Sequence, residues 1–141
     1  MGGSFPFLTI GIYLACGVLA LVIGFGAIKR PDFNIVPRRR RFRKVVVPGM
    51  VVSEVVDFLR RPVRGYQLYQ VDVDRGLVVW AEGPSYFSLG AFYPLYVDPT
   101  HQGVMVTCAI EPRVPLLDPF TVPRLRRLQR TVIAMVGGTA A

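Results

Sequence analysis

The chain has 141 residues, of which 52% are hydrophobic and 18% are charged, and its formal net charge is +8 at pH 7. This length suits one compact domain plus one extra element. The hydrophobic content excludes an intrinsically disordered chain. A mean hydropathy of +0.42 also argues against an ordinary soluble basic protein, because it indicates a concentrated apolar segment.

The positive charge is concentrated in one short part of the chain. Residues 1–28 contain no acidic or basic side chain, residues 29–44 carry a net charge of +7, and residues 45–141 carry only +1. The basic stretch therefore follows directly on an uncharged apolar run. This order is typical of a membrane anchor, and it disfavours a nucleic-acid-binding domain.

The apolar run at residues 5–28, after a short tail at residues 1–4, predicts a single-pass transmembrane helix. At 1.5 Å per residue the run is long enough to cross a hydrocarbon core of about 30 Å. A cleaved signal peptide is the main alternative, but the tail has no positive side chain and the run exceeds the usual length of about 7–15 residues. We therefore expect a retained span in an inner, plasma or thylakoid-type membrane.

The basic flank also predicts the orientation of this span. Positive side chains collect on the cytoplasmic side, so we expect the N-terminus outside or in a lumen, and the rest of the chain on the cytoplasmic, stromal or matrix side. Within the span, small residues recur at four-residue intervals. They predict a face for packing against another helix, unless they only reflect how common glycine and alanine are in such spans; they are Gly11, Ala15, Cys16, Ala20 and Gly24.

Residues 29–44 form a basic juxtamembrane arm. Prolines in and around it predict an extended chain. Its basic side chains are expected to contact anionic lipid or an acidic partner protein. Nucleic acid is not an expected partner, because Phe42 alone interrupts the run. The contact candidates are Arg38, Arg39, Arg40, Arg41, Arg43 and Lys44.

Residues 45–138 predict a small α+β domain, followed by a tail at residues 139–141. Apolar spacing and turn residues predict its elements in chain order: a strand at 42–47, a helix of about ten residues from 52, a hairpin at 66–81, strands at 86–97 and 104–111, and a helix at 122–136. Pro94 lies inside the expected strand at 86–97, and it predicts that this is an edge strand or contains a bulge.

Together these elements predict an antiparallel sheet of about four or five strands with one face packed against two helices. The layout resembles a shortened helix-grip domain, the START-like architecture in which a curved antiparallel sheet wraps a C-terminal helix. The resemblance rests on element order alone.

Candidates for chemistry are few. His101 lies in a polar turn, where a structural or exposed role outweighs ligation of a metal or of a pigment magnesium. Cys16 and Cys108 lack the spacing of a zinc site. We therefore predict no catalytic residue, no metal site and no bound cofactor, and we do not expect an enzyme. Contact with a pigment, quinone or lipid is left open, with His101 as the weak candidate.

Six of the sixteen aromatic residues fall between positions 80 and 96. They either fill the core, or form a partner surface or a pocket for a lipid, quinone or pigment tail. Alternation along a strand places some of them outside the core. They are Trp80, Tyr86, Phe87, Phe92, Tyr93 and Tyr96.

These features favour a non-catalytic accessory subunit of a larger membrane protein complex. Its expected partners are other integral membrane subunits and anionic lipid. The expected context is an energy-transducing assembly, either in photosynthesis or in respiratory electron transport. The alternatives are a membrane-tethered module that binds a lipid or a hydrophobic cofactor, and an assembly factor for a membrane complex.

Overall fold

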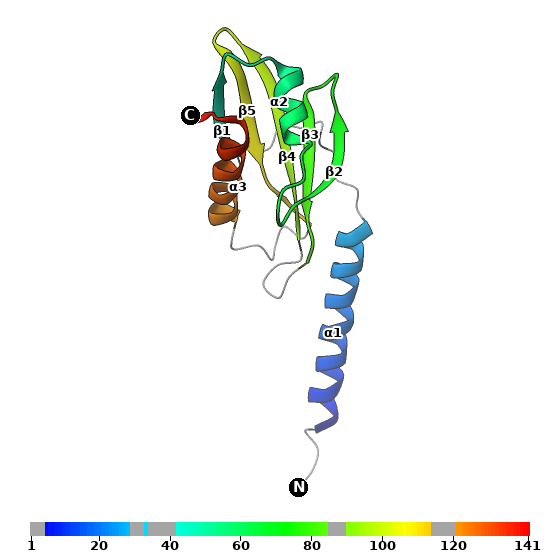
Figure 1. Cartoon of the computed structure of the whole chain (residues 1–141). Coiled ribbons are helices and arrows are strands. Elements are labelled where there is room, and N and C mark those ends of the chain that lie inside the picture. The colour runs from blue at the N-terminus through cyan, green and yellow to red at the C-terminus, as the bar shows by residue number, and fades with distance from the viewer. Residues whose placement is uncertain (1–4, 29–32, 34–41, 85–89, 114–120) are drawn as a thin grey trace. The chain divides into compact units, whose positions relative to one another are not determined.

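The computed structural model describes residues 5–28, 33, 42–84, 90–113 and 121–141. The chain divides into two units, Met1–Arg30 and Pro31–Ala141, and each is described by itself (Figure 1). Most of the predicted basic arm lies outside the described residues.

Helix α1, Phe5–Ile28, makes up the first unit. Its described side chains from Thr9 to Leu21 are all exposed, including Tyr13 at 74% and Leu14 at 65%. Among the described residues, no helix has both the length and the apolar character that a membrane crossing needs, so the transmembrane span predicted at residues 5–28 is not confirmed.

The second unit is built on one antiparallel sheet (Figure 1). Its strands are β1 (Phe42–Pro48), β2 (Gln67–Asp72), β3 (Leu77–Glu82), β4 (Ala91–Thr100), β5 (Gly103–Ala109), β6 (Glu111–Pro112) and β7 (Thr139–Ala140). Their order is β2-β3-β4-β5-β1-β7, and β6 pairs with β4. The prediction of a small α+β domain with an antiparallel sheet is confirmed.

The sheet has seven strands, where the sequence predicted about four or five. The additional strands, β6 and β7, are two residues long. A strand of two residues is too short to show the alternation from which strands are predicted.

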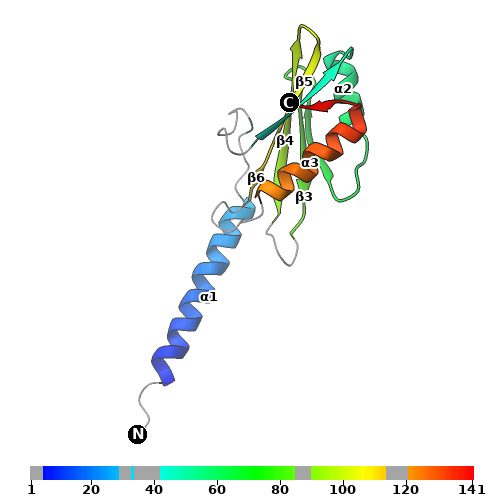
Figure 2. The same cartoon turned by 90° about the vertical axis from the view of Figure 1, so that its left-hand side faces the viewer.

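Helices α2 (Val52–Leu59) and α3 (Thr121–Val136) pack on one face of the sheet (Figures 1 and 2). Each has apolar residues at three- and four-residue intervals, which place them on the side of the helix that meets the sheet. The largest fully buried side chains of this core include Trp80, Tyr93, Leu59, Leu95, Leu125 and Leu128.

Pro94 was predicted to mark an edge strand or a bulge. The edge strand is wrong, because β4 lies inside the sheet, and the pairing of β4 with β3 shows no register shift at Pro94. On one side β4 pairs continuously with β3, where Pro94 lies opposite Val79. On the other side it pairs with β6 at Ala91 and Phe92, and with β5 only from Leu95 onward. The missing proline N–H therefore falls at a gap between two paired segments, where no ladder hydrogen bond is lost.

The other face of the sheet carries a second cluster of apolar side chains. Its buried members are Phe33, Leu77, Val79, Ala81 and Phe92, with Tyr96 packed against them. Tyr69 joins this cluster through edge contacts with Phe33 and Phe92, at centroid distances of 6.3 and 4.9 Å. In a regular strand, residues two positions apart face the same way, so Tyr69 would share a face with Val71. A register shift between Leu68 and Gln70 changes this, because a bulge turns a side chain to the opposite face.

The C-terminal segment closes against β1. The amide of Gln129 on α3 and the backbone N–H of Ala141 both donate to the carbonyl oxygen of Lys44, at 2.8 and 3.1 Å. Gly138 lies so close to β1 that an added Cβ would stand 2.7 Å from the carbonyl oxygen of Val46. Only a glycine therefore fits at this position without displacing β1.

Candidate functional site

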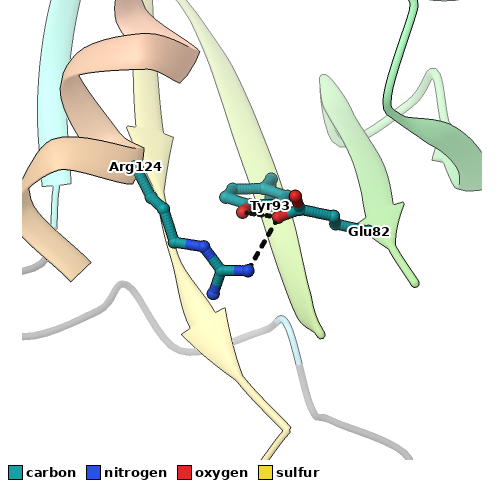
Figure 3. Close-up of polar contacts among 3 residues, drawn as sticks. All are labelled: Glu82, Tyr93 and Arg124. Atoms are coloured by element: carbon teal, nitrogen blue, oxygen red, sulfur yellow. Dashed lines mark hydrogen bonds and ion pairs between the residues drawn. The ribbon is translucent and has the colours of Figure 1, made fainter. Parts of the chain in front are cut away.

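Three polar side chains meet beneath the N-terminal part of α3 (Figure 3). The hydroxyl of Tyr93 on β4 donates a hydrogen bond to Oε2 of Glu82 at the end of β3, at 2.5 Å. Nη2 of Arg124 on α3 donates to the same carboxylate oxygen, at 3.0 Å. The side chains of Arg124 and Glu82 are only 14% and 27% exposed. The group therefore links three elements through a poorly hydrated ion pair.

Burial governs the protonation of Tyr93. Desolvation raises its pKa well above the ordinary value, and the hydrogen bond to Glu82 raises it further. The phenol therefore keeps its proton and acts as a donor to the carboxylate. This is a structural role, because a phenol held in its neutral form is a poor base near neutral pH.

A stack of aromatic rings runs from this polar group to the surface. The ring of Tyr66 meets that of Tyr93 edge to face at 5.2 Å, and lies tilted at 5.4 Å from that of Trp80. The indole N–H of Trp80 donates to the backbone carbonyl of Leu59 at 3.0 Å. Because this N–H is already bonded within the protein, the orientation of the indole ring is fixed without a hydrogen-bond partner from solvent.

The outer end of this stack lines a surface pocket of about 330 Å³. The pocket lies where the chain leaves α2 and enters β2. Its lining residues are Arg60, Arg61, Pro62, Val63, Tyr66, Gln67, Leu68 and Trp80.

A tight turn shapes one wall of the pocket. The backbone N–H of Tyr66 donates to the carbonyl of Val63 at 3.1 Å, and Gly65 between them has a φ of +90°. A positive φ at the third position of a turn is the mark of a type II turn, which glycine adopts without strain. Gly65 therefore allows the chain to reverse and places Tyr66 against Trp80.

Two exposed arginines, Arg60 and Arg61, line the pocket, and further exposed arginines lie on two segments of the same domain. Arg60, Arg61 and Arg64 come from the segment after α2, and Arg126, Arg127 and Arg130 come from α3. The two groups meet at Gly65, where an added Cβ would lie 3.7 Å from Nη2 of Arg127. Burial raises the pKa of Tyr66, while the nearby positive charge of Arg127 opposes that rise. Arg60 and Arg61 at the pocket and Arg127 near Tyr66 therefore bring positive charge to this part of the domain.

Two of these arginines are held in place by neighbours on α2. The guanidinium of Arg61 lies over the ring of Phe58, 4.2 Å from its centroid. Nη1 of Arg60 lies 3.4 Å from Oδ1 of Asp57, in a pair whose side chains are 43% and 71% exposed. Such an exposed pair is weak, so the donors of Arg60 remain free to bind an anion in place of water.

The predicted helix-packing residues lie on α1. Gly11, Ala15, Cys16 and Ala20 are exposed, and Gly24 is intermediate. Of the predicted arm contacts, Arg43 is exposed and Lys44 is half-buried on β1. The remaining four, Arg38, Arg39, Arg40 and Arg41, lie outside the described residues.

The predicted aromatic group is divided between the two faces of the sheet. Trp80 and Tyr93 lie in the core beneath the helices, at 2% and 1% exposure, whereas Phe92 and Tyr96 belong to the cluster on the other face. Of the four, only Trp80 lines the pocket. Tyr86 and Phe87 lie outside the described residues.

The remaining candidate residues, His101 and Cys108, do not line the pocket. His101 is exposed in the turn between β4 and β5. Cys108 is fully buried, and desolvation raises the pKa of its thiol to about 12, so it is not a nucleophile at neutral pH. Among the described residues, no group of three or more His, Cys, Asp or Glu side chains is placed to hold a metal ion.

Sequence reasoning missed both the polar group and the pocket. Glu82 and Arg124 are 42 positions apart, and no local pattern connects them. Arg60 and Arg61 follow α2 at a spacing that favours ion pairs with Asp57, and Arg60 forms one, but both also line the pocket. One signal was present: arginines next to a Pro-Val-Arg-Gly-Tyr turn at the end of a helix.

The fold and site define a small α+β domain with an arginine-rimmed aromatic pocket. No family model matches this chain, and neither a curated protein nor a solved structure does.

Proposed function

We propose that this protein is a non-catalytic subunit of a membrane protein complex, anchored by α1 and contacting its partners through the α+β domain. The observation that carries the proposal is the exposed apolar surface of α1. Seven large hydrophobic side chains on this helix are each at least 50% exposed: Ile10, Ile12, Tyr13, Leu14, Val18, Leu19 and Leu21.

Exposed apolar side chains on every side of a helix are costly in water. Transfer of each side chain from water to an apolar environment is favourable by roughly 1.5–3 kcal/mol, so the seven together strongly favour such an environment. The 24-residue helix carries no acidic or basic side chain, and a basic stretch follows it. A bilayer, together with helices of partner subunits, is the environment that fits both features.

The α+β domain supports a binding role better than a catalytic one. Its described core between the sheet and the two helices is filled by buried side chains. The buried thiol and the buried phenol are both held protonated. Its described surface carries several exposed arginines, which suit recognition of acidic or anionic partners.

Fractionation of cells that express the full chain tests the anchor. We expect the protein in the membrane fraction, resistant to high salt and alkaline carbonate and released by a mild detergent. Leu14→Arg combined with Val18→Arg should move it to the soluble or aggregated fraction, because arginine at the centre of a span costs about 2.5–3.5 kcal/mol per residue. The matched control, Leu14→Ile with Val18→Ile, should behave as wild type.

Purification in the same detergent tests the subunit role. We expect integral membrane partners to be recovered with the chain at a constant ratio. Wild-type protein that leaves the membrane in high salt would disprove the anchor, and a monomer without stoichiometric partners would disprove the subunit role.

A further inference from the structure

We propose that the pocket between α2 and β2 binds a small amphiphilic anion, a phosphate or carboxylate group attached to a short apolar body. The anionic group would bind to the guanidinium groups of Arg60 and Arg61. The apolar body would lie against the rings of Trp80 and Tyr66. The pocket lies wholly within the Pro31–Ala141 unit, so this inference does not depend on the membrane anchor.

The two rim arginines favour an oxyanion. A guanidinium has five N–H donors in a planar fork that matches the oxygens of phosphate or carboxylate. Stacking on Phe58 restricts Arg61 without using its donors. The long contact with Asp57 occupies one donor nitrogen of Arg60. Arg61 is thus positioned in advance, which reduces the conformational entropy lost on binding, whereas Arg60 is held only weakly by its exposed pair with Asp57.

The interior of the pocket favours an apolar group next to that anion. Trp80 is almost fully buried and its N–H is already bonded, so the surface that it offers is that of an aromatic ring. Tyr66, Val63, Pro62 and Leu68 continue this apolar lining. An inorganic anion alone would leave these surfaces uncovered, and an uncharged apolar molecule would leave the arginines without a partner.

The size of the pocket limits the ligand. Its volume of about 330 Å³ is at the lower end of the usual range for small-molecule sites, about 300–1,000 Å³. A compact ester or acid fits this volume, whereas a lipid with two long chains does not.

The chain supplies its own reporter for a binding experiment. Trp80 is the only tryptophan of the 141 residues and it lines the pocket, so a change in tryptophan emission reports on that site. The full chain in a neutral maltoside detergent is titrated with hexyl phosphate. Hexanol and inorganic phosphate serve as probes of the apolar part and the anionic part alone. We expect saturable binding of hexyl phosphate, and binding at least tenfold weaker for either of the other two probes.

Variants at the rim separate the pocket from general attraction to a basic surface. Arg60→Gln and Arg61→Gln should each raise the dissociation constant for hexyl phosphate about tenfold, because each removes a charge-assisted hydrogen bond. Arg126→Gln is the matched control, since it removes the same charge from an exposed position that does not line the pocket. It should leave binding within about twofold of wild type.

Three results would overturn the proposal. The first is no saturable change with hexyl phosphate in wild-type protein that is folded by circular dichroism. The second is an equal loss of binding in Arg126→Gln and in the two rim variants, which would indicate only a general basic surface. The third is a response to long-chain phosphatidic acid in the micelle without any response to dispersed hexyl phosphate, which would assign the arginines to a bilayer headgroup.

Discussion

Two carboxylates of the domain bind arginine in very different surroundings. Glu82 and Arg124 form their pair at low exposure, and Tyr93 adds a second donor to the same oxygen. Asp57 and Arg60 form theirs at higher exposure, 71% and 43%. Water screens the second pair, whereas loss of one partner in the first leaves a charge that is poorly solvated.

We therefore predict unequal effects of the same chemical change at these two carboxylates. Glu82→Gln should lower the free energy of unfolding by about 1–3 kcal/mol, because Arg124 loses its charged partner in a poorly hydrated position. Asp57→Asn should change it by less than about 0.5 kcal/mol. Urea unfolding of the full chain in detergent, followed by Trp80 emission, measures both. Equal effects would show that the Glu82 pair is as well hydrated as the exposed one.

At the scale of elements, the fold depends on close approaches between segments that are distant in sequence. Strand β7 pairs with β1 at Val45 and Val46, and Gly138 lies against the backbone of β1 beside that pairing. The sequence predicted a helix that ends at residue 136 and a tail at residues 139–141. It gave no sign that this tail becomes a strand, because its pairing partner is about ninety positions away.

A methyl group at Gly138 should therefore disrupt this edge of the sheet. Gly138→Ala brings Cβ to 2.7 Å from both the Val46 carbonyl oxygen and Cγ1 of Val45, and should cost about 1–3 kcal/mol of stability. Gly83→Ala is the control, because a Cβ there meets no atom within 4 Å. It should change stability by no more than about 0.5 kcal/mol. Urea unfolding and amide exchange of β1 distinguish the two, and equal stability of both variants would contradict the close packing at Gly138.

At the scale of the whole molecule, the nearly neutral charge of residues 45–141 hides a separation. Arg60 and Arg61 line the pocket, at the end of β2 where the strand begins. Asp72 and Asp74 lie at its other end together with Arg75, which pairs with Asp72 at 3.6 Å, and Asp98 lies on β4 near the same turn. The net charge of a segment therefore says little about the field at any one site.

Burial also makes the stability of the folded domain depend on pH. The thiol of Cys108 has an ordinary pKa of 9.0, which burial raises to about 12, and the pKa of Tyr93 is raised in the same direction. As pH rises above about 9, the unfolded chain loses protons that the folded chain retains. The free energy of unfolding is therefore nearly constant below about pH 9, and it falls as the pH rises toward 12.

We predict that the urea midpoint stays level between pH 7 and 8 and falls between pH 9 and 10. Cys108 contributes a slope of at most about 1.4 kcal/mol per pH unit. Cys108→Ala should lower the overall stability by leaving a small cavity, and should also flatten this fall. A fall of the same steepness in the variant and in wild type would show that Cys108 titrates alike in both states.

The sequence by itself determined the distribution of charge and the longer elements of secondary structure, but not the two-residue strands β6 and β7. Apolar periodicity predicted the helices α2 and α3 and the strands β2, β3, β4 and β5. Residues that face a core recur with the period of the helix or strand that carries them. The apolar run and its basic flank are likewise properties of consecutive residues. Such features depend on near neighbours, and so they can be predicted from the sequence.

Only the tertiary structure decided which residues meet. It placed β4 inside the sheet by aligning Pro94 with a gap in the pairing, and it turned Tyr69 to the opposite face through a bulge. It brought Arg124 to Glu82, and it enclosed Trp80 and Tyr66 behind two arginines. These contacts join positions that are far apart in the chain or depend on one residue of register, and no local period encodes them.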